Sequence, residues 1–231
     1  MKHITVIGLG AGDIDQLPLG IYNLLKTTSQ LFLRTKEHPV IRHLEKEGIQ
    51  YESFDAIYEA HDSFDAVYDN IVEKLLNLAE IGPIVYGVPG HPLVAEKTVQ
   101  LLIEQQKNGN VTLEIKGGQS FLDPLFTSVG LDPIDGFQLL DGTALSKEEI
   151  QPTQSLIIGQ VYDAFIASEV KLTLMEIYPD DYEVKLVTAA GTNEEVVQTV
   201  PLYELDRVTS LNNLTSLYVP KAKDETILYK Q

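Results

Sequence analysis

The chain contains no cysteine, and this absence excludes disulfide bonds, thiolate metal sites and cysteine nucleophiles. It also has no apolar run that approaches the roughly 20 residues needed to span a bilayer. The stretch from Met1 to Val6 lacks the basic region and the long apolar region of a secretory signal. We therefore expect a cytoplasmic protein with no membrane association.

Positive charge is scarce, since 17 lysines and arginines face 34 aspartates and glutamates and the formal net charge is -17. A surface this acidic repels a phosphate backbone, so we expect no nucleic-acid partner. The carboxylates between residues 55 and 69 do not show the spacing of metal ligands, and we expect no metal site.

The few cations are unevenly distributed, because five of the 17 lie within residues 26–46. In an acidic protein, such a cluster at the ligand end of a sheet is a candidate site for carboxylates or phosphates. The candidate anion ligands are Arg34, Lys36 and His38. A solvated helix face explains the same cluster equally well.

Residues 2–129 alternate between predicted strands and predicted helices. Apolar runs predict strands at 2–7, 31–33, 49–51, 83–86 and 111–115, and helical spacing predicts the segments between them. This alternation implies right-handed crossovers and a mostly parallel sheet. Ligands of such sheets bind at the carboxyl ends of the strands.

The polar stretch 141–153 interrupts this pattern and is interpreted as a linker. After it, strands are predicted at 155–158, 183–188, 196–200 and 216–219, with a helix at 162–177. We therefore expect an α/β protein of two α/β domains, with a mostly parallel sheet in residues 1–141 and a mixed sheet in residues 142–231.

A first glycine-rich turn, Gly8 to Asp13, directly follows the first strand. Its glycines, Gly10 and Gly12 included, let the backbone approach a ligand closely. A dinucleotide fingerprint would place a glycine where Asp13 stands and an acidic residue where Arg34 stands, so NAD(P) is a disfavoured ligand. A tight turn with Asp13 as a helix cap is the structural alternative.

Two further turns follow later strands. Residues 86–92 contain two glycines and two prolines and can offer N–H and C=O groups to an adenosine or an amino-acid end. His91 in this turn is either a general base or a solvent-facing structural histidine. Residues 116–120 lead into a predicted helix, where N–H groups suit an anion and where Ser120 equally serves as the N-cap.

Taken in order, these motifs resemble those of the tetrapyrrole (corrin/porphyrin) methylase family. The family's opening G-x-G-x-G-D turn matches residues 8–13, and its G-D-P-type loop resembles Gly90-His91-Pro92. Its P-G-x-[ST] segment resembles residues 117–120, and its late A/N-G-T-x-x-E/Q stretch matches residues 190–195. The resemblance covers nearly the whole chain, and its specificity lies in the order and spacing of the motifs.

The resemblance implies two α/β domains with S-adenosylmethionine bound in a cleft between them, usually in a homodimer. The positions that it implies for donor binding are Gly10, Gly12, Asp13, Pro89, Gly90, His91, Val94, Ser120, Phe121, Gln160 and Gly191. No catalytic base is nominated, because a sulfonium donor is already activated and the protein must mainly align the reacting atoms and exclude water.

Three positions depart from the family's pattern. Ala11 stands where cobalamin-pathway members carry proline, His91 replaces the usual aspartate, and Gly117 replaces the proline of the P-G-x-[ST] segment. These departures bear on specificity for tetrapyrroles more than on donor binding.

Residues 33–39 and 63–68 resemble the YabN-like subgroup, in which the methylase-like domain is fused to a MazG-type nucleoside triphosphate pyrophosphohydrolase. This sequence carries no paired E-x-x-E-type metal motif, so MazG chemistry is not assigned to it. We expect a methyltransferase that acts on a small anionic acceptor. The alternative is a non-catalytic module that binds S-adenosylmethionine or a nucleotide and regulates a larger protein with a MazG-type domain.

Overall fold

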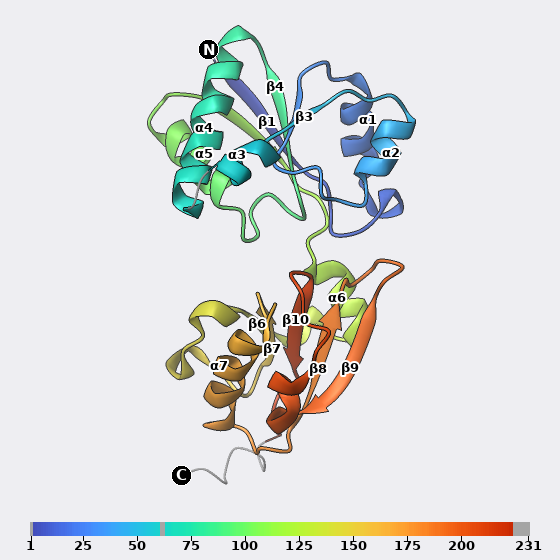
Figure 1. Ribbon diagram of the computed structural model, residues 1–231, viewed down its shortest axis with the longest axis vertical. Coiled ribbons are helices and arrows are strands. Elements are labelled where there is room, and N and C mark those ends of the chain that lie inside the picture. The colour runs from blue at the N-terminus through green and yellow to red at the C-terminus, as the bar shows by residue number, and fades with distance from the viewer. Residues whose placement is uncertain (1, 61–62, 224–231) are drawn as a thin grey trace. The chain divides into compact units, whose positions relative to one another are not determined.

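The computed structural model describes residues 2–60 and 63–223. The chain divides into two compact units, residues 1–123 and 124–231 (Figure 1). This division lies earlier than the predicted one at 141/142, because strand β6 (Phe137–Asp141) pairs with β7 (Ser155–Gly159) inside the second unit. The predicted linker is also part of that unit, where it forms the short 3-10 helices η3 (Gly142–Ala144) and η4 (Lys147–Glu149).

The first unit is built on a five-stranded parallel sheet in the order β3-β2-β4-β1-β5. Its strands are β1 (His3–Gly8), β2 (Leu31–Leu33), β3 (Glu52–Ser53), β4 (Ile84–Val88) and β5 (Thr112–Lys116). Strand β1 lies between β4 and β5, so the turns after these three strands leave the sheet side by side.

Helices cover both faces of this sheet (Figure 1). On one face lie α1 (Leu19–Thr27) and α2 (Ile41–Lys46), and on the other lie α3 (Asp55–Ala60), α4 (Phe64–Ile81) and α5 (Lys97–Lys107). The alternation of side chains along β1 supplies both cores, since Ile4 and Val6 pack toward α4 and α5 while Ile7 packs toward α1 and α2. Strands buried on both faces explain the continuous apolar runs of the sequence.

The second unit contains a mixed sheet in the order β6-β7-β10-β8-β9. Besides β6 and β7, its strands are β8 (Glu183–Thr188), β9 (Val196–Pro201) and β10 (Thr215–Val219). Only the pair β6 and β7 is parallel among these described strands. Helix α7 (Ala164–Met175) and the 3-10 helix η5 (Leu202–Arg207) pack on the sheet around a core of their own.

Three further short elements lie in the connections between strands. Helix α6 (Leu122–Val129) begins at the boundary between the units, η1 (Ile14–Gln16) follows the first glycine-rich turn, and η2 (Pro133–Asp135) precedes β6. Within the part of the chain that the structure describes, no helix has both the length and the apolar character needed to cross a membrane.

The α/β fold with two sheets is the predicted one, but two elements differ. The third strand is Glu52–Ser53 rather than residues 49–51. Residues 49–51 instead leave helix α2 through a left-handed Gly48 (φ +72°), and Ile49 N–H donates to Leu44 O at 3.0 Å in the bonding pattern of a helix C-terminus. Strand β6 was not predicted, because its residues are only partly buried and lack a clear alternation.

Candidate functional site

Three glycine-rich turns meet at the carboxyl edge of the parallel sheet. The last residue of β1, Gly8, stands opposite Val88 at the end of β4, and Ile7 stands opposite Lys116 at the end of β5. Residues 8–13, 87–92 and 117–120 therefore start from neighbouring positions, and we call these three segments the glycine edge. Parallel α/β sheets bind their ligands at this edge.

The first two turns are joined by main-chain hydrogen bonds. Gly10 N–H donates to Gly90 O at 3.2 Å, and Gly90 N–H donates to Gly10 O at 2.8 Å. Both glycines have left-handed backbones, with φ of +78° and +64°, a conformation that glycine adopts without steric cost. Leu9 N–H also donates to Val88 O at 2.8 Å, so the pairing of β1 and β4 continues past the strands.

Close approach of the backbones explains why glycine stands at two positions of this edge. A Cβ atom on Gly8 would lie 2.4 Å from Gly90 O and 2.9 Å from Pro92 Cδ. A Cβ atom on Gly118 would lie 2.8 Å from Gly8 O. The three turns thus touch one another through main-chain atoms.

His91 lies over Gly117. Its Nδ1 accepts a hydrogen bond from Leu93 N–H at 3.1 Å, so that Nε2 carries the proton of the neutral ring. A Cβ atom on Gly117 would lie 2.9 Å from that Nε2. The two departures from the family's pattern at positions 91 and 117 are therefore spatially coupled, because the imidazole occupies space that a side chain at position 117 would need.

Asp13 and Ser120 both cap short helical elements. The Asp13 carboxylate accepts from Ile14 N–H at 2.7 Å at the start of η1, and its side chain is exposed. Ser120 Oγ accepts from Leu122 N–H at 3.1 Å and donates to Asp123 Oδ2 at 3.2 Å at the start of α6. Both side chains therefore have the capping roles that were the structural alternatives for these positions. The main-chain groups of both residues belong to the glycine edge.

The remaining predicted donor residues of the first unit lie in the same turns or directly after them. Val94 N–H donates to His91 O at 3.0 Å, which closes the turn after β4. Pro89, Val94 and Phe121 are each partly exposed. Gly12 is buried, and a Cβ atom there would lie 2.5 Å from Oε1 of Gln16.

The three candidate anion ligands have separate environments. Lys36 has an exposed side chain, and its backbone N–H donates to Asp55 Oδ2 at 2.9 Å. His38 Nε2 donates to Gly10 O at 2.8 Å, and its Nδ1 accepts from Val40 N–H at 3.3 Å. His38 therefore fastens the loop after β2 to the glycine edge as a neutral ring.

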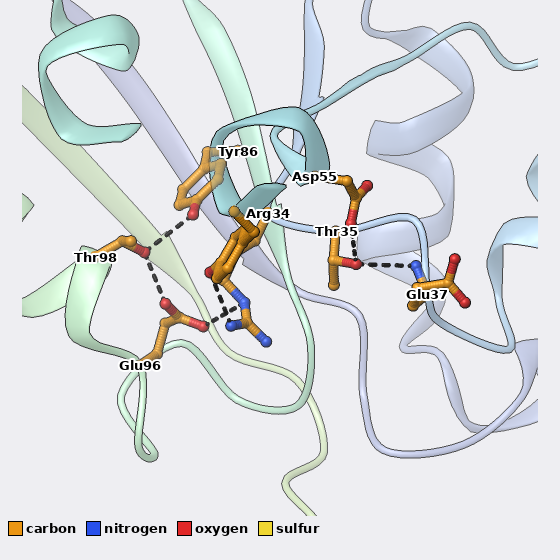
Figure 2. Close-up of polar contacts among 8 residues, drawn as sticks. Arg34, Thr35, Glu37, Asp55, Tyr86, Glu96 and Thr98 are labelled. Atoms are coloured by element: carbon orange, nitrogen blue, oxygen red, sulfur yellow. Dashed lines mark hydrogen bonds and ion pairs between the residues drawn. The ribbon is translucent and has the colours of Figure 1, made fainter. Parts of the chain in front are cut away.

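Hydrogen bonds also fix the start of this loop. Thr35 Oγ1 donates to Asp55 Oδ1 at 2.6 Å and accepts from Glu37 N–H at 3.0 Å (Figure 2). Burial alone would raise the pKa of Asp55, but the hydrogen bonds from Thr35 and from the Lys36 backbone outweigh it and leave the pKa lowered. The loop is thus anchored through Asp55 at the start of α3.

Arg34 takes part in a buried polar network (Figure 2). Its Nε lies 3.0 Å from Glu96 Oε2 as an ion pair, although the N–H is not aligned well enough for a hydrogen bond, and its Nη1 donates to Tyr58 Oη at 3.2 Å. Beyond Glu96, Thr98 Oγ1 donates to Glu96 Oε1 at 2.7 Å and lies 3.0 Å from Tyr86 Oη. Glu96, Thr98 and Tyr86 are all buried.

The charge of Arg34 is maintained within this network. Burial acts to lower the pKa of the guanidinium, but the negative charge of Glu96 and the interactions with Tyr58 and Tyr86 together outweigh it, and the pKa lies above its ordinary value. Burial raises the pKa of Tyr86 well above its usual range, so this hydroxyl stays neutral. One positive and one negative charge thus face each other among neutral hydroxyl groups.

Four residues of this network were not predicted as site residues, namely Tyr58, Tyr86, Glu96 and Thr98. A signal was present for Thr98, because it occupies the buried face of α5 together with Val99 and Leu102. A polar residue on an otherwise apolar helix face requires a hydrogen-bond partner, and that partner is Glu96.

Two predicted residues belong to the second unit. Gln160 directly follows β7, is exposed, and has a left-handed backbone with φ +62°. Gly191 follows β8 with φ +75°, and its N–H donates to Glu195 Oε2 at 2.6 Å. A non-glycine residue in the left-handed region is uncommon and is concentrated at functional sites, which keeps Gln160 of interest.

Comparisons with known proteins agree with these motifs. Residues 3–206 match the family model described as "Tetrapyrrole (Corrin/Porphyrin) Methylases". The chain is 56% identical over 228 residues to "Uncharacterized protein YabN" of Bacillus subtilis (strain 168). That alignment covers 99% of this chain and 47% of YabN, so the chain spans about half the length of this relative.

Solved structures share the fold. Uroporphyrin-III-C-methyltransferase from Thermus thermophilus is similar with a TM-score of 0.72 and 19% identity over 95% of this chain and 92% of that one. Diphthine synthase is similar with a TM-score of 0.69 and 15% identity over 94% and 89%. From the family match over most of its length and from its close relative, we conclude that the chain belongs to the tetrapyrrole (corrin/porphyrin) methylase family.

Proposed function

We propose that the chain is an S-adenosylmethionine-dependent methyltransferase that acts on a small anionic acceptor. The observation that carries this proposal is the glycine edge, where three turns in the order of the family's motifs meet through the paired Gly10 and Gly90 and through the close contact of Gly118 with Gly8. The donor supplies an activated methyl group, and the acceptor's lone pair takes up the methyl carbon as the carbon–sulfur bond breaks. Turns fixed to one another through main-chain contacts suit this reaction, which depends on alignment more than on acid–base chemistry.

The proposed donor residues of the first unit are Gly10, Gly12, Asp13, Pro89, Gly90, His91, Val94, Ser120 and Phe121. Gly90 is the position best suited to a test. Its φ is +64°, and none of the described atoms beyond its chain neighbours lies within 4 Å of where a Cβ atom would stand. A side chain at this position would project from the glycine edge into space that we assign to the donor.

Isothermal titration of the purified chain with S-adenosylmethionine, S-adenosylhomocysteine and NADPH tests the proposal. We expect saturable binding of the first two ligands and none of NADPH, because the first turn departs from the dinucleotide fingerprint at Asp13. Absence of binding for both S-adenosyl compounds would overturn the proposed donor.

A matched pair of variants tests the place of binding. Gly109 has φ +77°, equally open surroundings among the described residues, and a position between α5 and β5 at the opposite edge of the sheet. Gly90→Arg and Gly109→Arg therefore introduce the same side chain with similar backbone strain, about 1 kcal/mol each. We expect only Gly90→Arg to abolish donor binding, and equal affinity in the two variants would contradict the assignment.

Gln160 and Gly191 are proposed as donor residues of the second unit. Gln160→Ala and Gln160→Gly separate two contributions of this position, because the first removes the amide and the second also relaxes the left-handed backbone. We expect both substitutions to weaken binding of S-adenosylhomocysteine. Unchanged affinity in both would remove Gln160 from the proposed site.

A second candidate function is a non-catalytic module that binds S-adenosylmethionine or a nucleotide. It is favoured by the length of YabN, about twice that of the matched region, which leaves room for a further domain that we propose to be of MazG type. Methyl transfer to any acceptor from a panel of small carboxylates, measured with a radiolabelled donor, separates catalysis from binding alone. A cytoplasmic homodimer is proposed in either case, and light scattering after gel filtration tests the dimer.

A further inference from the structure

The guanidinium of Arg34 is enclosed on one side and open on the other. Its Nε side faces Glu96, whose side chain is 5% exposed, whereas the Arg34 side chain as a whole is 26% exposed. Nη2 has no hydrogen-bond partner among residues 2–60 and 63–223. Figure 2 shows this end of the guanidinium pointing away from Glu96 and Tyr86.

Several contacts hold the guanidinium in this orientation. Glu96 is itself held by Thr98, which lies against Tyr86, and Tyr58 accepts from Nη1 on the side of α3. Ala95, the residue before Glu96, has a left-handed backbone with φ +53°. Such strain costs of order 1 kcal/mol or more and persists only where the surroundings maintain it.

This arrangement lies beside the glycine edge within the same unit. Arg34 N–H donates to Gly87 O at 2.9 Å at the start of the turn after β4. Four residues further on, His38 donates to Gly10 O. Both ends of the segment 34–38 are therefore fastened to the glycine edge, where the proposed donor binds.

We propose that Arg34 binds a carboxylate of the methyl acceptor through Nη2, and that Glu96 and Thr98 are positioning residues for it. This proposal rests on the proposed function, since it assigns a subsite for the acceptor of that reaction. A guanidinium with open N–H donors is the protein group best matched to a carboxylate. Lys36, exposed two residues away, is the second cation of the same loop.

The ion pair gives the proposal a testable sign. Glu96 attracts Arg34 but repels a carboxylate bound on the other side of the guanidinium. Glu96→Gln keeps an amide oxygen beside Nε and removes that repulsion, so binding of a carboxylate becomes about tenfold tighter at low salt. A purely structural ion pair would give no such gain.

Two variants that differ only at Arg34 isolate its role. Arg34→Gln alone leaves the buried Glu96 without a cation and destabilises the fold. The double variant Arg34→Gln, Glu96→Gln removes both charges, and its matched partner is Glu96→Gln. Arg42→Gln, on the exposed side of α2, serves as a control for the loss of one arginine.

The experiment is isothermal titration of these variants with succinate and with inorganic phosphate, at low salt and with S-adenosylhomocysteine both present and absent. We expect succinate to bind the wild-type chain and Arg42→Gln equally, Glu96→Gln about tenfold more tightly, and the double variant at least about tenfold more weakly than Glu96→Gln.

Three results would overturn the proposal: no succinate binding, equal binding to the double variant and Glu96→Gln, or binding of phosphate in preference to succinate. The donor titration on the same samples separates this proposal from the proposed function. If succinate binding depends on Arg34 but the donor does not bind, the proposed methyltransferase function is excluded and the anion subsite remains. If the donor binds but succinate binding does not depend on Arg34, the anion subsite is excluded and the proposed function remains.

Discussion

Substituting Gly8 with alanine tests whether the glycine edge depends on contact between backbones. The added Cβ atom would lie 2.4 Å from Gly90 O, 2.9 Å from Pro92 Cδ and 3.3 Å from Gly118 N. Two of these neighbours are main chain and the third is a proline ring, so none can rotate away. The added methyl group must therefore move the turns apart.

The expected loss in the free energy of unfolding is at or above the upper end of the roughly 1–3 kcal/mol typical of overpacking. A loss of about 3 kcal/mol corresponds to a fall in Tm of roughly 6–12 °C for a chain of this size. Because the chain contains no tryptophan, far-UV circular dichroism in urea and on heating is the suitable measurement.

Gly20→Ala is the matched control. Gly20 lies in helix α1, and no described atom outside the helix backbone and its chain neighbours lies within 4 Å of its Cβ position. There the same substitution removes backbone entropy from the unfolded chain and stabilises the helix by about 0.5–1 kcal/mol. If Gly8→Ala were as stable as Gly20→Ala, the argument from close backbone contact would be refuted.

Two further predictions concern His38 and His91. Burial and the charge of Arg34 lower the pKa of His38, although Gly10 O and Asp13 act in the opposite direction. The unfolded chain therefore binds more protons than the folded chain, and stability falls as the pH drops below about 6.5. His38→Gln should flatten this dependence between pH 7 and pH 5 in urea titrations, and parallel profiles would contradict it. Gly117→Ala should destabilise the fold because the added Cβ atom crowds His91. In a double-mutant cycle with His91→Ala, we expect a coupling energy of about 0.5–3 kcal/mol between the two positions. Additive effects on stability would show that the ring moves freely and would contradict the prediction.

Much of the first unit could be predicted because its sequence and its fold share one pattern. Strands such as β4 are apolar throughout and are buried on both faces, and helices such as α4 bury residues at helical spacing. The first two glycine turns marked the carboxyl edge for the same reason, since they follow the buried strands β1 and β4. The short β3 was predicted at the wrong residues because Ile49 and Tyr51 look like strand residues, whereas they pack beside the end of α2.

The polar network could not be predicted from local patterns. Arg34 and Glu96 are 62 residues apart in the sequence, and only the pairing of β2 with β4 brings the segments that follow these strands together. Glu96, preceding a helix of ordinary charged composition, gives no sign of burial by itself. Long-range ion pairs of this kind follow from sheet order, which a single sequence specifies only weakly.

The glycine edge has a consequence for how sequences of this kind diverge. Its turns contact one another through main-chain atoms, so substitutions of the surrounding side chains leave these contacts unaltered. Glycine is required where a Cβ atom would meet main chain, as at Gly8 and Gly118, and is favoured where the backbone is left-handed, as at Gly10 and Gly90. Selection can thus preserve this edge through a few glycines while neighbouring side chains, Arg34 and Lys36 among them, are free to change.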